Sequence, residues 1–197
     1  MMFVPKLILA SASSRREELL LQLGLSFEVM PQDITEKCNI GESPEKFVTR
    51  MADEKAKSAL VVHKDNNKVI LASDTIVVIN GEVLGKPINK NESIKMLLSL
   101  SKKSHRVLSA VTVASPEKQK SVLTETVVVF REISEIEADY YWGSGEPAGK
   151  AGGYAIQGLG AVFVESIVGS YSGVVGLPLF ETALLLKEFG VSCWQYK

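Results

Sequence analysis

The sequence predicts a mixed α/β fold with several antiparallel strand pairs rather than a regular βαβ repeat. Apolar runs of strand length alternate with segments of helical periodicity along the 197 residues. Asn80-Gly81 separates two apolar runs, and this dipeptide is typical of the type I′ turn in a β-hairpin. Residues 104–115 and 120–133 are both rich in β-branched side chains, which predicts a second pair of adjacent strands.

The first 30 residues predict a strand, a helix and a second strand. Residues 6–10, KLILA, form an apolar run of strand length, and the small polar segment that follows predicts a turn. A helix is expected from Ser14 to Leu23, and Gly24 is placed to end it. Residues 26–30, SFEVM, are expected to continue as a strand.

The next segment predicts a helix followed by a hairpin. In residues 42–63, Ser43 is a fitting N-cap and Pro44 suits the first helical position. Apolar side chains then recur at helical spacing through this segment. Residues 68–87 predict a buried strand that turns back at Asn80-Gly81.

The second half of the chain predicts two short helices, further strands and a final helix. Residues 91–101 have the length of a short helix, and Ser134 begins a capping box that predicts another helix start. Residues 153–176 alternate glycines with apolar residues, which favours strands and tight turns. Pro178 and Gly190 bracket the last predicted helix.

The composition predicts one globular domain, residues 1–197. Hydrophobic residues make up 46% of the chain, charged residues make up 23%, and the formal net charge is -1. A near-neutral chain without a basic block is not expected to bind nucleic acid by broad phosphate neutralisation. Every apolar run stops well short of 18 residues, so no membrane partner is expected either.

The cysteines and the start of the chain indicate a cytoplasmic location. Cys38 and Cys193 are too few and too far apart to form a disulfide framework, which favours thiols in a reducing compartment. The apolar stretch near the N-terminus is too short for a signal peptide.

Two adjacent arginines, Arg15 and Arg16, follow a run of small hydroxyl residues where the first helix is expected to begin. Cations are disfavoured at that end of a helix, whereas its unpaired backbone N–H groups bind phosphate well. Ser11, Ser13 and Ser14 add hydroxyl groups to the same segment. The pattern fits a phosphate site, and it equally fits a solvated helix start whose arginines pair with the two glutamates that follow.

Further along the chain, three charged residues are candidates for the same site, and the position of Lys55 and of Asp74 each allows two interpretations. Lys55 falls on the apolar face of its helix, where it either extends to the helix edge or points into a cleft. Asp74 interrupts an apolar strand and either caps a turn through Ser73 and Thr75 or faces a cleft. In a cleft it could hold a divalent metal or take a proton from water. Lys86 lies just across the hairpin as a positive partner, which favours the functional interpretation of Asp74.

Residues 146–163, EPAGKAGGYAIQGLGAVF, hold five glycines and one proline. Several of these glycines are expected to have positive φ or to allow close approach of the backbone to a ligand. Gln157 carries an amide that can read a base edge, although a hairpin-rich core with a satisfied glutamine also fits. The sequence contains neither a P-loop nor the setting of a dinucleotide-binding fingerprint. His63 and His105 lack metal-ligand spacing, so structural roles are expected for both.

Five strings considered together carry a family resemblance. They are LASASSRRxxLLxxLG, EKA, SDTIVVINGEVLGKP, EPAGKAGGYAIQGLGAVFV and GSYSGVVGLPL. In this order, from about Leu7 to about Gly190, the chain resembles the Maf family of nucleoside triphosphate pyrophosphatases. GYAIQGLG, with its glutamine, is similar to the branch that acts on dTTP and UTP. The chain departs from the family pattern at Ser14, where proline is usual, and at Gly173, where asparagine is common.

The resemblance implies roles for individual residues. Asp74 matches the proton acceptor, and Glu36 matches an acidic residue near the metal and the attacking water, so both are implied ligands of Mg²⁺ or Mn²⁺. The side chains implied to bind the nucleotide are Ser11, Arg15, Arg16, Lys55, Thr75, Lys86 and Gln157. Among these, Gln157 occupies the position implied to select the base.

The resemblance also implies a fold, a reaction and an assembly. The family fold has an elongated, largely antiparallel central sheet flanked by helices, with two lobes around a cleft, similar to the inosine triphosphate pyrophosphatases. The implied reaction is metal-dependent hydrolysis of dTTP and UTP to the monophosphate and pyrophosphate, and a homodimer is expected. Two alternatives stay open at this point. One is hydrolysis of other nucleotides, such as 7-methyl-GTP or modified pyrimidine nucleotides, and the other is nucleotide-dependent regulation of cell division and septum formation.

Overall fold

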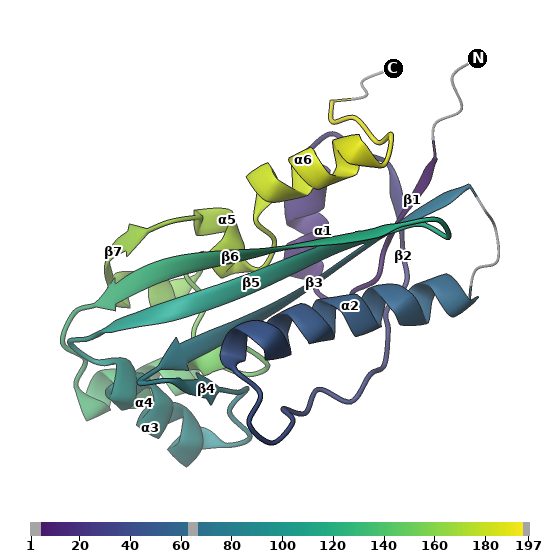
Figure 1. The fold of residues 1–197 in the computed structure, drawn as a ribbon. Helices are drawn as coiled ribbons and strands as arrows, with labels where there is room; N and C mark the ends of the chain where they lie inside the picture. The colour runs from purple at the N-terminus through teal and green to yellow at the C-terminus, as the bar shows by residue number, and fades with distance from the viewer. Residues whose placement is uncertain (1–4, 63–66, 195–197) are drawn as a thin grey trace.

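A central sheet of seven strands organises the fold in the computed structural model, which describes residues 5–62 and 67–194 (Figure 1). The strands are β1 (Lys6–Leu9), β2 (Phe27–Val29), β3 (Lys68–Ile79), β4 (Glu82–Leu84), β5 (Ser104–Ala114), β6 (Gln119–Phe130) and β7 (Val164–Val168). The helices are α1 (Ser14–Leu21), α2 (Pro44–Val62), α3 (Lys90–Leu100), α4 (Glu135–Gly143), α5 (Tyr171–Val175) and α6 (Leu179–Glu188). Two short 3₁₀ helices, η1 (Ala151–Gly153) and η2 (Leu159–Phe163), complete the described elements.

The sheet is mixed and largely antiparallel, as predicted. Its order is β2-β1-β3-β5-β6-β7, with β4 paired to β3. β1 runs parallel to β2 and β3, and the four remaining strand pairs are antiparallel. β3, β5 and β6 each have 11 or 12 residues, which elongates the sheet to about 40 Å at ~3.3 Å per residue.

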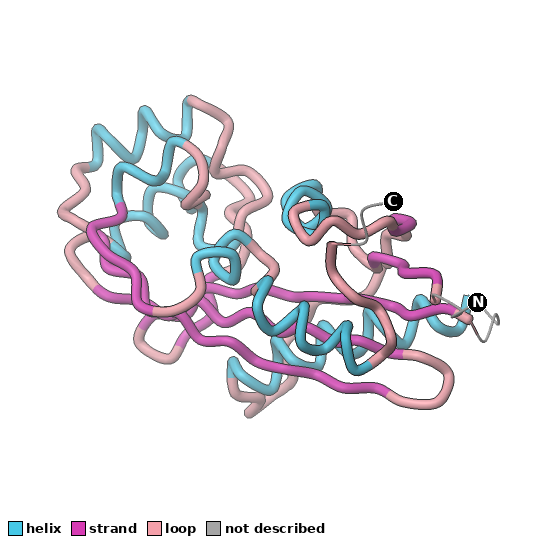
Figure 2. Tube along the Cα trace, turned by 90° about the horizontal axis from the view of Figure 1, so that it is seen from above, coloured by secondary structure: helices cyan, strands magenta, loops and turns pink. Residues whose placement is uncertain are grey.

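The alternation of side-chain direction along the strands places α2 and α6 on opposite faces of the sheet. On β5, Val107 and Val111 share a core cluster with Leu185 of α6, whereas Leu108 and Ala110 share one with side chains of α2. Successive strand residues point to opposite faces, so α2 covers one face and α6 covers the other (Figures 1 and 2).

The two neighbours of β3 on one side leave part of that strand uncovered. β1 pairs with residues 68–71 of β3, and β4 pairs with residues 77–79. Residues 72–76 between them face neither strand on this side, although β5 pairs with them on the other side. The sheet therefore has an open notch in its middle, and the carboxyl end of β1 points into it.

Most predicted elements are present with small changes at their ends. α1 begins at Ser14, α2 begins at Pro44, and the hairpin turns at Asn80, which has φ 52°. Ser134 forms the predicted capping box at the start of α4. His63, expected at the end of the second helix, lies outside the described residues.

The prediction of strands and tight turns over residues 153–176 is wrong in part. This segment contains one strand, β7, together with η2 and the short helix α5. Gly153 and Gly169 adopt positive φ, which interrupts extended pairing. The backbone before β7 instead wraps around a carboxylate, that of Glu146, which accepts hydrogen bonds from two of its N–H groups.

His105 is enclosed in an aromatic cluster of the core. Its side chain is 2% exposed, its ring packs edge-on against Phe130 and Tyr154, and its Nε2 lies 2.8 Å from the Tyr154 hydroxyl. Burial lowers the pKa of His105 to about 4. The predicted structural role agrees with this enclosed position.

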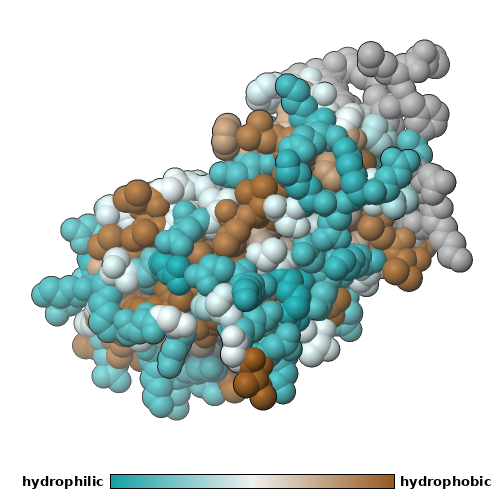
Figure 3. All heavy atoms as spheres, viewed as in Figure 1, coloured by the Kyte–Doolittle hydropathy of each residue, from teal (hydrophilic) through white to brown (hydrophobic). Residues whose placement is uncertain are grey.

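The face of the molecule shown in Figure 3 is largely hydrophilic, with apolar groups over the region of α5 and α6. The exposed apolar side chains of α5 and α6 include Tyr171, Phe180 and Leu184.

Within residues 5–62 and 67–194, no helix combines the length and the apolar character needed to cross a membrane. The homodimer implied by the family resemblance stays a prediction.

Candidate active site

A cleft of about 580 Å³ opens at the notch beside residues 72–76 of β3. Its size lies in the range of ordinary small-ligand sites. The lining comes from the segment between β1 and α1, the loop before α2, both faces of β3, the end of the β4 hairpin and the glycine-rich loop before η2. All nine side chains assigned to the site from the sequence line this cleft.

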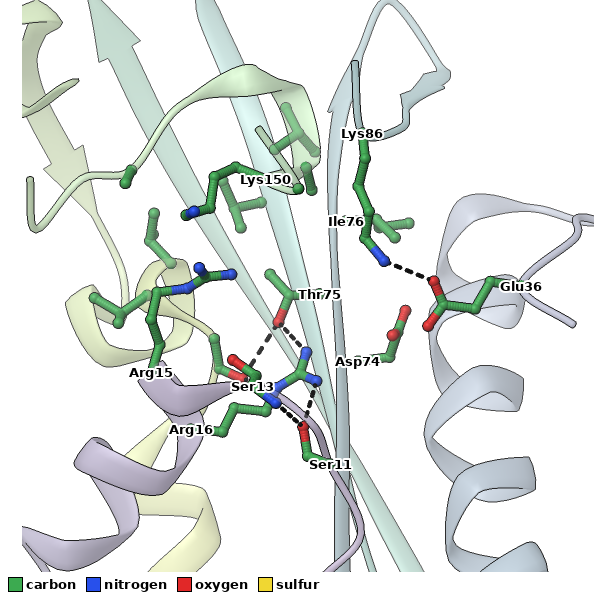
Figure 4. A pocket seen from close by; sticks show the side chains of 18 of the residues that line it. Ser11, Ser13, Arg15, Arg16, Glu36, Asp74, Thr75, Ile76, Lys86 and Lys150 are labelled. Atoms are coloured by element: carbon green, nitrogen blue, oxygen red, sulfur yellow. Dashed lines mark hydrogen bonds and ion pairs between the residues drawn. The ribbon is translucent and has the colours of Figure 1, made fainter. Parts of the chain in front are cut away.

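The notch explains how two successive strand residues serve one cleft. Asp74 and Thr75 point to opposite faces of β3. Asp74 contacts Lys55 on α2, whereas Thr75 contacts Arg16 on α1 (Figure 4). Because this edge of β3 lacks a neighbouring strand, a ligand in the cleft can reach both side chains.

Arg16 is held in the cleft by three oxygen atoms. Its Nε donates to the Gly176 carbonyl at 2.9 Å, and its terminal nitrogens donate to Ser11 Oγ at 3.3 Å and Thr75 Oγ1 at 3.4 Å. Burial lowers the pKa of Arg16, and the negative charge of Asp74 partly offsets this effect. In the described part of the chain neither Arg15 nor Arg16 forms an ion pair with the glutamates that follow, so the alternative of a solvated, self-paired helix start is wrong.

The Gly176 carbonyl gathers several donors behind the arginine. Ser73 Oγ donates to it at 3.1 Å, and Thr75 Oγ1 lies 3.4 Å away. The residue caps the C-terminus of α5 with φ 140°, a conformation that L side chains rarely adopt. This backbone atom fixes the direction of the Arg16 guanidinium.

A hydroxyl pair links Thr75 to the same helix. Thr75 Oγ1 lies 3.0 Å from Ser109 Oγ on the neighbouring strand, and Ser109 Oγ donates to the Gly173 carbonyl at 2.6 Å. Gly173 is buried, and a side chain there would press on Ser170. The departure from asparagine thus lies behind the cleft, in the packing of α5, rather than in its lining.

Two carboxylates and two lysines form a continuous chain on the α2 side of the cleft. Lys55 Nζ donates to Asp74 Oδ1 at 2.7 Å and to Glu36 Oε1 at 2.6 Å, and Lys86 Nζ donates to Glu36 Oε2 at 2.9 Å. Lys55 is 6% exposed and Asp74 is 8% exposed. Lys55 therefore points into the cleft rather than extending to the helix edge.

The charges of this chain keep Glu36 ionised. Burial alone raises the pKa of Glu36, but the hydrogen bonds and positive charges of Lys55 and Lys86 outweigh it and lower the pKa to about 2. The carboxylate is consequently negative over the whole physiological pH range.

The donor set fits a divalent cation held jointly with a substrate. Asp74 and Glu36 bring carboxylate oxygens to the cleft, and the second oxygen of Asp74 accepts no hydrogen bond from the described residues. No group of three or more His, Cys, Asp or Glu side chains suited to a metal occurs in residues 5–62 and 67–194. Mg²⁺ is commonly bound by one or two carboxylates together with substrate phosphates, so two carboxylates are sufficient for such a site.

The glycine-rich loop forms the opposite wall of the cleft. Exposed Gln157 and half-buried Lys150 both lie on it and line the cleft. Gly152 N donates to the Gly85 carbonyl at 2.9 Å, which ties the loop to the hairpin that carries Lys86. A Cβ on Gly152 would press against Val77, so glycine is needed for this close approach.

A half-buried carboxylate shapes the part of the loop around Gln157. Glu146 accepts hydrogen bonds from the Tyr141 hydroxyl at 2.6 Å and from the N–H groups of Leu159 and Gly160 at 2.9 Å each. Burial alone raises the pKa of Glu146, but these hydrogen bonds outweigh it and lower the pKa. The anion is therefore a fixed structural support of the loop.

Comparison with known proteins shows the family of the chain. Residues 6–189 match the family described as Maf-like protein. The chain belongs to this family. The dTTP/UTP pyrophosphatase of Saccharophagus degradans is 51% identical over 191 residues, covering 96% of this chain and 91% of that protein. The dTTP/UTP pyrophosphatase of Vibrio vulnificus is 48% identical, covering 93% and 98% respectively.

One solved structure, described as the structure of the Staphylococcus aureus Ham1 protein, aligns with 66% of this Maf-like chain and 72% of its own. The TM-score is 0.44 and the sequence identity is 17%.

Three residues of the Maf-like site were missed by sequence reasoning. Lys150 lies within the quoted string EPAGKAGG, but its charge was not assigned to the cleft. Gly176 acts through its backbone carbonyl, which no side-chain pattern reveals. Glu146 begins the quoted string but received no role, whereas the two glycines of GLG, twelve and fourteen residues later, signal that a bulky group lies against the backbone there.

Proposed function

We propose that this protein is a nucleoside triphosphate pyrophosphatase that hydrolyses dTTP and UTP to the monophosphate and pyrophosphate. The observation that carries the proposal is the cleft itself, in which two carboxylates and several cationic side chains surround the open notch of β3. The names of the relatives that are 51% and 48% identical support the choice of substrate.

Asp74 is the proposed proton acceptor. Lys55 holds one of its oxygens at 2.7 Å, which leaves the other oxygen to accept a proton from water. The oxygen of that water bonds to the α-phosphorus, and the bond from this phosphorus to the bridging oxygen breaks. The electron pair of that bond leaves with the β-phosphate oxygen as pyrophosphate.

The cationic side chains stabilise charge that develops on the leaving group. Arg16, Lys55 and Lys86 are already oriented by hydrogen bonds, so little reorganisation accompanies the reaction. Asp74 and Glu36 would hold a Mg²⁺ or Mn²⁺ ion, which would supply Lewis-acid polarisation of a phosphate oxygen.

Gln157 is the proposed base-selecting residue. It lines the same cleft as Asp74, and its amide offers one donor side and one acceptor side to a base edge. A pyrimidine with both a carbonyl and a ring N–H, as in thymine and uracil, matches this pair.

The direct test is pyrophosphate release by the purified protein with Mg²⁺ or Mn²⁺. The panel consists of dTTP, UTP, CTP, 5-methyl-UTP, 7-methyl-GTP and ITP. We expect release from dTTP and UTP above the others, with the nucleoside monophosphate as the second product. Release confined to 7-methyl-GTP or ITP would keep the reaction and overturn the substrate choice. Tight nucleotide binding without release would favour a regulator of cell division instead.

A further inference from the structure

Two cationic side chains face each other across the cleft without a carboxylate between them. Figure 4 shows Arg15 on α1 and Lys150 on the glycine-rich loop, with their charged ends directed toward one another. Lys150 Nζ donates to the Ala148 carbonyl at 3.2 Å, and neither residue forms an ion pair within the described part of the chain. This arrangement costs free energy in the unliganded protein, because like charges repel most strongly where water is partly excluded.

The surroundings of both groups support this interpretation. Burial lowers the pKa of Arg15, with a smaller opposing effect of Glu18. Burial also lowers the pKa of Lys150, the nearby charge of Arg15 lowers it further, and the charge of Glu146 has a smaller opposing effect. Lys55 and Lys86, on the other side of the cleft, each have a carboxylate partner. The cleft therefore has a compensated side, where each lysine has a carboxylate partner, and an uncompensated side, where Arg15 and Lys150 form no ion pair.

We propose that Lys150 is a substrate-binding residue that forms, with Arg15, a subsite for the terminal phosphates of the substrate. The identity of the anion as a triphosphate rests on the proposed function. Figure 4 shows the Arg16 guanidinium between Asp74 and Arg15, and both of these charges act on its pKa. An α-phosphate beside Asp74 thus directs the β- and γ-phosphates past Arg16 toward Arg15 and Lys150.

The loop presents Lys150 in place before any ligand arrives. Gly149 has φ 70° and Gly152 has φ 67°, so the backbone turns sharply on both sides of the lysine. The hydrogen bond from Gly152 N to Gly85 O anchors this turn to the β4 hairpin. A lysine on an anchored turn loses less conformational freedom on binding an anion than one on a free loop.

The subsite provides positive charge for the leaving group of the reaction. The leaving pyrophosphate gains negative charge as its bond to the α-phosphorus breaks. Two cations that form no ion pair in the described part of the chain are available to this charge. Lys150 and Arg15 therefore bind the leaving group more strongly than they bind the nucleoside monophosphate, which has no terminal phosphates.

The test compares Lys150→Gln, Lys150→Arg and Arg15→Gln with the wild-type chain. Lys187→Gln is the matched control, because Lys187 is an exposed lysine on α6 outside the cleft. Calorimetry with Mg²⁺ in the buffer measures the affinity for pyrophosphate and, separately, for dTMP. We expect Lys150→Gln and Arg15→Gln to weaken pyrophosphate binding about 10- to 100-fold, the usual effect of losing a hydrogen bond to a charged group.

Binding of dTMP is expected to change less than about 2-fold in these variants, within the scatter of substitutions that remove no contact. Lys150→Arg is expected to retain most of the pyrophosphate affinity, and Lys187→Gln is expected to match the wild type. Unfolding midpoints within a few degrees of the wild type check that each variant is folded. Unchanged pyrophosphate affinity in Lys150→Gln, an equal loss of dTMP binding, or no pyrophosphate binding by the wild type would each overturn the subsite.

Kinetics separates this proposal from the proposed function. If the wild type hydrolyses dTTP while Lys150→Gln keeps the wild-type KM and pyrophosphate affinity, the function stands and the subsite is wrong. If the wild type hydrolyses no nucleotide but binds pyrophosphate in a manner that depends on Lys150, the subsite stands and the function is wrong.

Discussion

Asp74 illustrates how much of the proposed chemistry depends on single atoms. One oxygen is engaged by Lys55 at 2.7 Å, and the other is available to water. Asp74→Asn keeps the size of the side chain but cannot accept the proton, so pyrophosphate release from dTTP should fall roughly 10²- to 10⁴-fold. Calorimetry with dTTP should still show binding, because the phosphate-binding cations remain. Wild-type turnover in this variant would contradict the proposed role.

His105 provides a prediction about acid stability. Its folded pKa of about 4 lies below its ordinary value of 6.5, so the unfolded chain binds more protons between these values. Stability from this group is full above pH 6.5 and is lost as the pH falls toward 4. Between pH 7 and pH 5 the loss amounts to about 2 kcal/mol.

The measurement is the urea unfolding free energy at pH 7 and pH 5 for the wild type and His105→Gln. Glutamine can still bond the Tyr154 hydroxyl but does not titrate. The wild type should lose about 2 kcal/mol more than the variant over this interval. Parallel losses in both proteins would show that His105 is not the titrating group.

Sequence reasoning reached the charged residues of the site individually but not their partners. Lys55 was ambiguous because a lysine on an apolar helix face can extend outward, and only its two short contacts decide otherwise. Lys150 was missed because one lysine in a glycine-rich loop carries no distinctive spacing. Its significance depends on Arg15, which is 135 residues away in the chain.

At the scale of elements, helix α1 invites a stabilising change at its first residue. Ser14 is exposed, and Ser13 before it is extended with φ -82° and ψ 112°, a conformation compatible with a following proline. Proline at the first helical position loses no intrahelical hydrogen bond. Ser14→Pro should raise the unfolding free energy by about 0.4–1 kcal/mol in urea titrations and leave turnover unchanged. A destabilised protein would show that the Ser14 amide has a partner in solution.

At Gly158, in the glycine-rich loop, we expect a substitution to lower the unfolding free energy. A Cβ there overlaps the Glu146 carboxylate, so Gly158→Ala must displace the group that holds the loop beside Gln157. We expect a loss of about 1–3 kcal/mol in urea unfolding, together with a raised KM for dTTP. Gly143→Ala is the matched control, because a Cβ at Gly143 meets no atom within 4 Å. Equal stability of the two variants would contradict the support assigned to Glu146.

The elements that sequence reasoning placed well are those with strong local signals. The start of α2 at Pro44 and the turn at Asn80-Gly81 follow from backbone preferences that act within a few residues. Residues 153–176 were misassigned in part because Gly158 and Gly160 lie against Glu146, which precedes them in the chain. In the sequence, a glycine that ends a strand cannot be told from a glycine that leaves room for a neighbouring side chain.

At the scale of the whole molecule, the cleft is a consequence of strand register. β1 stops pairing with β3 at residue 71, and β4 begins pairing at residue 77. The intervening edge exposes both faces of the strand, so helices α1 and α2, on opposite faces, can supply groups to one ligand. No pattern within β3 itself reveals this notch, because it depends on where two other strands begin and end.

A ligand in the cleft contacts segments that lie far apart in the chain, which predicts strong linkage between binding and stability. The segment before α1 lies on one side of the cleft, and the glycine-rich loop lies on the other. A ligand that binds only the folded chain at 100 times its Kd adds about 2.7 kcal/mol. For a chain of 197 residues, this corresponds to a rise in Tm of about 5–10 °C.

Asp74→Asn allows this linkage to be measured with intact dTTP, because turnover no longer consumes the ligand. Its Tm should rise by about 5–10 °C with Mg²⁺ and dTTP at 100 times the Kd. At that same dTTP concentration, a second change, Arg15→Gln, should reduce the rise, because the terminal phosphates lose one of the two cations on the uncompensated side. A matched double variant that carries Lys187→Gln should keep the full rise. If all three proteins shifted equally, the stabilisation would come from contacts on the α2 side alone, and Arg15 would not hold the terminal phosphates.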